Sequence, residues 1–145
     1  MIRYTQDFLC RCQHEVEPLA ALEWQESGRP TEALEIDWDK YAALEDQGVV
    51  RFYAARDGDV LIGYAVVLLF SPLTMRDRRF AIVDAVYVAK THRGIGKALF
   101  TFVEDCLRED GLERLVASSS VINPIGAFLT RMGYEEAETK YEKAL

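Results

Sequence analysis

The chain has 145 residues, of which 50% are apolar and 28% charged, with a formal net charge of −7. This length predicts one domain spanning residues 1–145, long enough to bury roughly 68–70% of the unfolded surface. The composition is that of a soluble globular protein and excludes a disordered chain. No apolar run approaches the ~20 residues of a membrane span, so we expect no membrane partner. The N-terminus lacks a basic stretch followed by an apolar one, which predicts no secretory signal.

The charge and the cysteines restrict the partners further. The acidic balance disfavours nucleic acid and mildly favours a cationic or amine substrate, although it also serves solubility alone. Three cysteines, Cys10, Cys12 and Cys106, are an odd count without a dense framework, which predicts reduced thiols and a cytoplasmic location. Cys10, Cys12 and the nearby His14 are too few ligands for zinc, so we expect no metal.

The first half of the chain predicts two helices and a hairpin. Apolar residues at helical spacing predict a helix over 8–27, ended by the stretch Gly28-Arg29-Pro30. A shorter helix is expected over 37–47. Strands over 49–55 and 60–70 flank the turn dipeptide Asp57-Gly58, which predicts an antiparallel hairpin.

The second half predicts a crossover unit. A polar loop over 71–79 leads to a strand over 80–89 that is apolar on both faces, as central strands are. A turn at 90–94, a helix over 95–109 and a strand over 115–117 complete a strand–helix–strand unit with parallel strands. Asn123-Pro124 is expected to open another helix that stops at Gly133, and residues 134–145 to add one or two strands. These elements predict an α/β (mixed α+β) fold with a mixed sheet.

The segment from Arg93 to Ala98 carries the most distinctive chemistry. A glycine-rich turn that enters a helix offers unpaired backbone N–H groups, a partial positive charge and room for a phosphate group. Arg93 and Lys97 add positive charge. The turn is too short for the phosphate loop of nucleotide hydrolases and lacks the third glycine of the dinucleotide fingerprint. On its own it is equally compatible with an ordinary strand-to-helix turn.

In this context the chain resembles the GNAT superfamily of N-acetyltransferases. The cofactor motif of that family, Arg/Gln-x-x-Gly-x-Gly/Ala, is matched by Arg93, Gly96 and Ala98. The resemblance extends to the strand over 84–88, to Asn123, and to the closing Met132-Gly133-Tyr134. The stretch Trp38-Asp39-Lys40-Tyr41 and the tail residues Tyr141, Lys143 and Leu145 are similar to phage-like members. The loop is shorter than in many members, so Gly94-Ile95-Gly96 could align with the second half of the motif and leave Thr91 in the arginine's place.

The resemblance implies a mostly antiparallel twisted sheet with a central parallel splayed strand pair and helices on both faces. Acetyl-CoA, as cosubstrate, would lie where the strand at 84–88 diverges from residues 115–120. An amide of this strand would face the thioester oxygen, and Asn123 would bind the pantetheine amides or simply cap its helix. The implied cofactor-binding residues are Val86, Tyr87, Val88, Arg93, Gly94, Ile95, Gly96, Lys97, Ala98, Asn123 and Phe128.

Catalysis in such an enzyme needs a base for the amine. Asp84 is the first candidate, because burial on an apolar strand would raise its pKa, although it could equally be structural. Glu45 and Glu35 are weaker candidates. Many family members place a tyrosine as general acid where this chain has Leu129. Tyr134, Tyr141 and Tyr87 remain as acid candidates, although Tyr134 and Tyr87 also suit packing, and water could serve instead.

The leading expectation is therefore acetyl transfer from acetyl-CoA to a primary amine by direct attack in a ternary complex. A non-catalytic module that binds acyl-CoA or a protein partner on the same fold is the alternative, and the absent tyrosine favours it slightly. A nucleotide-binding interaction domain is a third possibility, which predicts stabilisation by ATP instead of CoA. The sequence does not identify the amine, and a homodimer is compatible with it.

Overall fold

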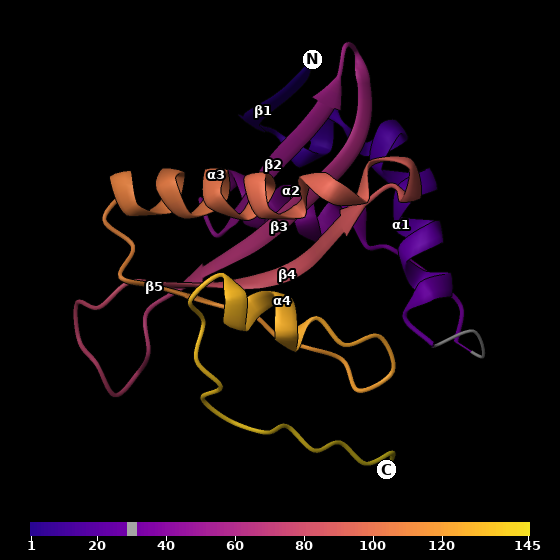
Figure 1. Ribbon diagram of the computed structural model, residues 1–145. Coiled ribbons are helices and arrows are strands. Elements are labelled where there is room, and N and C mark those ends of the chain that lie inside the picture. Colours follow the sequence, from indigo (N-terminus) through magenta and orange to yellow (C-terminus); the bar gives the residue numbers. More distant parts are fainter. Residues whose placement is uncertain (29–31) are drawn as a thin grey trace.

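The computed structural model describes residues 1–28 and 32–145 (Figure 1). In chain order the elements are β1 (Ile2–Asp7), the 3-10 helix η1 (Leu9–Arg11), α1 (Gln13–Glu26), α2 (Trp38–Asp46), β2 (Val50–Asp57), β3 (Val60–Phe70), β4 (Phe80–Val88), the 3-10 helix η2 (Lys90–Ile95), α3 (Gly96–Glu109), β5 (Arg114–Val116) and α4 (Gly126–Arg131). Gly28 has a positive φ of 78°, as expected at a helix stop, whereas Arg29 and Pro30 of the expected stop lie outside the described residues.

In the part of the chain that the structure describes, one mixed sheet holds five strands in their chain order. The hairpin expected over 49–70 is confirmed, because β2 and β3 pair antiparallel around Gly58 and Asp59, with φ of 60° at Gly58. β4 pairs antiparallel with β3 and parallel with β5. The strand–helix–strand unit with α3 as its crossover is therefore also confirmed.

Helices cover both faces of the sheet, as the family resemblance implies (Figure 1). Successive side chains of β2 point to opposite faces. Phe52 and Ala54 pack with Val16 and Ala20 of α1, while Tyr53 and Ala55 pack on the other face, under α3. The buried residues of α3 are Leu99, Phe100, Val103 and Leu107. Leu99, Val103 and Leu107 recur every four residues and form one apolar stripe that packs on the sheet.

The N-terminal segment differs from the expectation. β1 was not predicted, and the helix expected to begin at residue 8 starts as η1, with α1 proper beginning at Gln13. β1 pairs with β2, and Tyr4 packs 6.1 Å from the Phe102 ring of α3. Six residues with mixed polarity carry little strand signal of their own. The contacts that stabilise β1 come from segments about 50 and 100 residues away in the chain.

The C-terminal expectations are partly wrong. Residues 134–145 form no strand, and from 135 onward they are exposed. Figure 1 shows this tail leaving the body of the molecule below α4. The parallel pair β4–β5 therefore stands at the edge of the described sheet. α4 begins at Gly126 with Ile125 as its N-cap, so Asn123 does not cap the helix.

Removing residues 136–145 is expected to leave the melting temperature within about 2 °C of that of the full chain. The deleted side chains are exposed and lie outside the sheet, and such changes rarely exceed about 0.5 kcal/mol. Thermal unfolding followed by circular dichroism measures the difference. A drop of more than about 5 °C would mean that the tail packs on the domain in solution.

The sequence predicts no membrane span, no metal site and reduced cysteines, and the described residues bear on each. Among residues 1–28 and 32–145, no helix has the length and apolar character needed to cross a bilayer. Within the same ranges, no group of three or more potential ligand side chains is placed to hold a metal ion. All three cysteines are free thiols, and Cys12 is buried.

Candidate active site

The site begins where β4 and β5 diverge. Their parallel pairing covers only Phe80–Ile82 with Arg114–Val116. Beyond Ile82, β4 continues for six residues without this partner. The backbone N–H and C=O groups that point to this edge therefore form no hydrogen bonds with β5. The splayed strand pair that the family resemblance implies is thus present in the fold.

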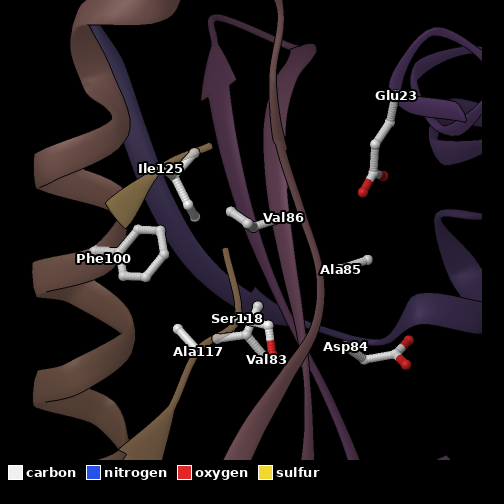
Figure 2. Close-up of a pocket in the computed structure, with 9 residues that line it drawn as sticks. All are labelled: Glu23, Val83, Asp84, Ala85, Val86, Phe100, Ala117, Ser118 and Ile125. Carbon is white, nitrogen blue, oxygen red and sulfur yellow. The ribbon is translucent and has the colours of Figure 1, made fainter. Parts of the chain in front are cut away.

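A β-bulge lies at this divergence. Val67 pairs with Val83 and Val66 pairs with Ala85, which leaves Asp84 as the extra residue of β4. A bulge bends its strand and redirects side chains, and bulges are common beside active sites. Here it places the carboxylate of Asp84 on the side of α1, away from β5 (Figure 2).

A cavity of about 170 Å³ lies at this point. Figure 2 shows Phe100, Ile125 and Ala117 on the side of α3, whereas the two carboxylates lie toward α1. The lining residues are Glu23, Val83, Asp84, Ala85, Val86, Phe100, Ala117, Ser118 and Ile125. The cavity therefore has an apolar wall with access to strand backbone, and an acidic wall on the opposite side of β4.

Each carboxylate of the acidic wall accepts a hydrogen bond from a tyrosine. The hydroxyl of Tyr64 in β3 donates to Oε2 of Glu23 over 2.7 Å. The hydroxyl of Tyr41 in α2 donates to Oδ2 of Asp84 in a short hydrogen bond. Among residues 1–28 and 32–145, no arginine, lysine or histidine lines this cavity. The wall is therefore negatively charged and has two hydroxyl groups that fix the carboxylate orientations.

Burial and nearby charges shift several pKa values here. Burial, together with the negative charge of Asp84, raises the pKa of Glu23 above the ordinary value, although the hydrogen bond from Tyr64 opposes this. Burial and the neighbouring carboxylates raise the pKa of both Tyr41 and Tyr64. The two tyrosines therefore stay protonated at neutral pH and remain hydrogen-bond donors.

Asp84 lies on β4 where the sequence predicts it, but the expectation that it is buried is wrong. The side chain is exposed, and not buried on a doubly covered strand, because β5 ends opposite Ile82 and the bulge turns Asp84 outward. Its role as a base remains a prediction without that support.

Glu23 is a functional candidate that sequence reasoning missed. It lies seven residues after Val16 and three after Ala20, both of which are buried against the sheet. This spacing places Glu23 on the apolar face of α1. An acidic residue that interrupts the apolar stripe of a helix was the signal that could have identified it.

The glycine-rich turn lies at the end of β4 and enters α3. Residues 90–95 form η2, and the helix continues as α3 from Gly96, slightly later than the sequence predicts. Ile95, the N-cap residue of α3, makes no side-chain capping hydrogen bond. A methyl group added to Gly94 would meet nothing within 4 Å, and the side chain of Lys97 is exposed. The turn thus presents open backbone and a free lysine to solvent.

Arg93, which the sequence predicts as a phosphate ligand, contacts other groups of the protein. Its Nη2 lies 2.8 and 3.0 Å from the two carboxylate oxygens of Glu26 in α1. Its Nε donates to the carbonyl oxygen of Val88 over 2.8 Å, and its guanidinium lies 5.4 Å from the ring centre of Tyr87. Burial acts to raise the pKa of Glu26, but the hydrogen bond and charge of Arg93 outweigh it and lower that pKa. Arg93 thereby links α1 to the end of β4.

The other residues expected to bind the cofactor lie along β4, at the start of α3, and in and before α4. Val86 lines the cavity, and Tyr87 is buried with a hydroxyl that has no hydrogen-bond partner in the described chain. Phe128 of α4 packs 5.3 Å from the Phe100 ring and close to Gly96. Asn123 is exposed in the loop before α4. Ile95, Lys97 and Ala98 lie at the junction of η2 and α3.

The tyrosines expected as acids do not line the cavity. Tyr134 donates to Oε2 of Glu104 over 2.7 Å, and burial with this hydrogen bond raises its pKa. Tyr141 is 92% exposed in the tail, and Leu129 is buried in α4.

The weaker base candidates also lie elsewhere. The carboxylate of Glu45 accepts the backbone N–H groups of Leu9 and Cys10, over 2.6 and 3.2 Å, which gives it a structural role at η1. Glu35 is exposed in the segment before α2. Neither residue lines the cavity.

Comparison with known proteins identifies the fold. The chain is 23% identical to a ribosomal-protein-alanine N-acetyltransferase from Brucella melitensis biovar Abortus 2308, with a TM-score of 0.75 and coverage of 100% of this chain and 99% of that one. An aminoglycoside acetyltransferase from an uncultured soil metagenomic sample, solved with sisomicin, is 15% identical, with a TM-score of 0.78 and coverage of 99% and 96%.

A predicted acetyltransferase from Clostridium acetobutylicum, solved with acetyl-CoA, is 14% identical, with a TM-score of 0.75 and coverage of 99% and 96%. No curated protein matches the chain. These identities are low, so they show a shared fold only. The model of the acetyltransferase (GNAT) family matches residues 13–134. This range includes the helices on both faces of the sheet, the splayed strands and the glycine-rich turn. The chain therefore belongs to the GNAT family of acetyltransferases.

Proposed function

We propose that the protein is an N-acetyltransferase that moves an acetyl group from acetyl-CoA to a primary amine by direct attack in a ternary complex. The observation that carries this proposal is the cavity at the divergence of β4 and β5, with an apolar wall on one side and an acidic wall on the other. The thioester of acetyl-CoA fits the apolar wall, and a cationic amine fits the acidic wall. The reaction requires the thioester carbon and the amine nitrogen to come into contact, and a cavity with both walls allows this.

The residues on the apolar side fit acetyl-CoA. The backbone of β4 from Val86 to Val88 lacks a β5 partner and offers hydrogen-bonding groups to the pantetheine arm and the thioester oxygen. Gly94 has open space around it, and the uncapped N-terminus of α3 provides N–H groups and partial positive charge for the pyrophosphate. Lys97 supplies the mobile positive charge, since Arg93 is held by Glu26.

The acidic side fits the amine. Glu23 and Asp84 attract a cation, and the formal net charge of −7 aids its approach. An acceptor with a carboxylate near its amine would be repelled by the same wall. We therefore propose that the substrate is a cationic amine, such as a diamine, an aminoglycoside or a basic peptide terminus.

Thermal unfolding with acetyl-CoA, CoA and ATP tests the cofactor assignment. CoA and acetyl-CoA at about 100 times their Kd are expected to stabilise the native protein by about 2.7 kcal/mol. ATP is expected to have little effect. Stabilisation by ATP alone would contradict the proposal and favour a nucleotide-binding domain.

Thiol release from acetyl-CoA tests the reaction. A matched series that shares one carbon chain, 1,4-diaminobutane, 4-aminobutan-1-ol and 4-aminobutanoate, varies only the distal charge. We expect kcat/KM to fall in that order, with at least tenfold between the first and the last. Binding of CoA without thiol release for any amine, including aminoglycosides and peptides, would instead support the non-catalytic alternative, which the buried Leu129 at the usual acid position favours.

A further inference from the structure

The two carboxylates of the acidic wall are not equivalent. Glu23 is half-buried on the apolar face of α1, and Figure 2 shows its carboxylate directed toward β4. Asp84 is exposed in the bulge. A proton acceptor for an ammonium group must be ionised before the reaction and yet basic enough to take the proton. The environments of the two groups therefore decide which one suits that task.

Glu26, one helical turn after Glu23 in α1, is already neutralised by basic side chains. Both oxygens of Glu26 are held by Arg93, and the Nζ of Lys90 lies 3.5 Å from one of them. Glu23, in contrast, forms no ion pair with a described residue. Among the described residues, the Glu23 carboxylate accepts one hydrogen bond, from Tyr64 to Oε2, which leaves Oε1 available.

From this geometry we infer that Glu23 is the residue that takes the proton from the acceptor amine, with Tyr64 as its positioning residue. The inference rests on the proposed acetyl transfer and assigns the proton acceptor within the same site. Asp84, held by Tyr41, contributes negative charge that binds the acceptor. The shift in the pKa of Glu23 supports the assignment, because burial makes this carboxylate more basic than an exposed one.

The reaction balances with Glu23 in this role. The protonated amine gives one proton to the Glu23 carboxylate, and its nitrogen lone pair then attacks the carbonyl carbon of the thioester. The N–C bond forms and the C–S bond breaks. The second proton on nitrogen goes to the departing thiolate. Glu23 returns its proton to solvent, so the products are the acetylated amine, CoA as a thiol, and one proton.

The decisive variant is Glu23→Gln, which keeps the shape of the side chain and an oxygen for Tyr64 but cannot take a proton. We expect kcat to fall about 100-fold, within the usual range for removal of a general base, with a smaller rise in KM because one negative charge of the acidic wall is lost. The acid limb of the wild-type kcat/KM profile, where activity falls as Glu23 becomes protonated, should disappear. Asp84→Asn should mainly raise KM, and Glu17→Gln, at an exposed position on the same helix, should match wild type.

A stability measurement gives a second readout that needs no turnover. The pKa of Glu23 is raised in the folded state, so its contribution to stability is present at low pH and is lost as pH rises through that pKa. Glu23→Gln should therefore gain melting temperature relative to wild type as the pH rises from 4 to 8. Glu17→Gln should show no such trend.

These measurements distinguish a failure of the proposed acetyl transfer from a failure of the Glu23 assignment alone. Wild-type protein that binds CoA but releases no thiol with any amine overturns the proposed acetyl transfer and this inference with it. An active wild type whose Glu23→Gln variant keeps its kcat and its acid limb overturns the inference alone. Loss of both features in Asp84→Asn would assign the proton acceptor to Asp84 instead.

Discussion

Reversing the charge of Lys97 is expected to remove most of the stabilisation that CoA gives, without destabilising the free protein. Lys97 is exposed in the first turn of α3, and no ion pair holds it within the described chain. A charge-assisted hydrogen bond contributes about 1.5–3 kcal/mol, so Lys97→Glu should raise the Kd of CoA roughly 10- to 100-fold. Negative charge near a helix N-terminus is favourable, so the melting temperature of the free variant should stay equal or rise slightly.

Calorimetric titration with CoA and thermal unfolding of the free variant measure the two effects. Lys143→Glu makes the same change in net charge in the exposed tail and serves as the control. An unchanged Kd in Lys97→Glu would place the pyrophosphate elsewhere. Arg93→Glu is a poorer choice, because it would set two carboxylates side by side at Glu26 and weaken the contact between α1 and β4.

Truncating Leu99 to alanine is expected to cause a large loss of stability, about 3–4 kcal/mol. Leu99 is fully buried between α3 and the sheet, among Tyr53, Val67 and Val103. The variant loses the transfer free energy of the removed atoms and leaves a cavity that the packed sheet cannot close. This change should lower the melting temperature by about 10 °C.

Denaturant unfolding of Leu99→Ala at constant pH gives the free energy directly. Leu73→Ala, at a fully exposed leucine in the loop before β4, should change it by less than about 0.5 kcal/mol. Equal effects of the two substitutions would contradict the packing of α3 on the sheet. CoA binding by Leu99→Ala should be measured well below its melting temperature, so that unfolding of the variant does not itself reduce binding.

The active-site region combines residues that are distant in the chain. Glu23 comes from α1, Tyr41 from α2, Tyr64 from β3 and Asp84 from β4. The two hydrogen bonds that join them span 41 and 43 residues of sequence. A site assembled in this way is positioned by the packing of α1 and α2 on the sheet, so substitutions in that core should also affect acceptor binding.

The sequence by itself determined the elements whose signals are local. The hairpin at β2 and β3 follows from β-branched residues around a turn dipeptide, and α3 follows from apolar residues at helical spacing after a glycine-rich turn. The parallel crossover from β4 to β5 follows from the order of those elements. The glycine-rich motif with its helix N-terminus identified the family for the same reason, because it is contiguous in the chain.

Only the tertiary structure decided the rest. β1 depends on pairing with β2, and the tail forms no strand despite its expected place in the sheet. The exposure of Asp84 depends on where β5 ends, and the engagement of Arg93 depends on Glu26, 67 residues earlier. Glu23 becomes a candidate only when the cavity is seen beside it. Each of these properties arises from contacts between distant segments, whose free energies are not encoded in any local pattern of residues.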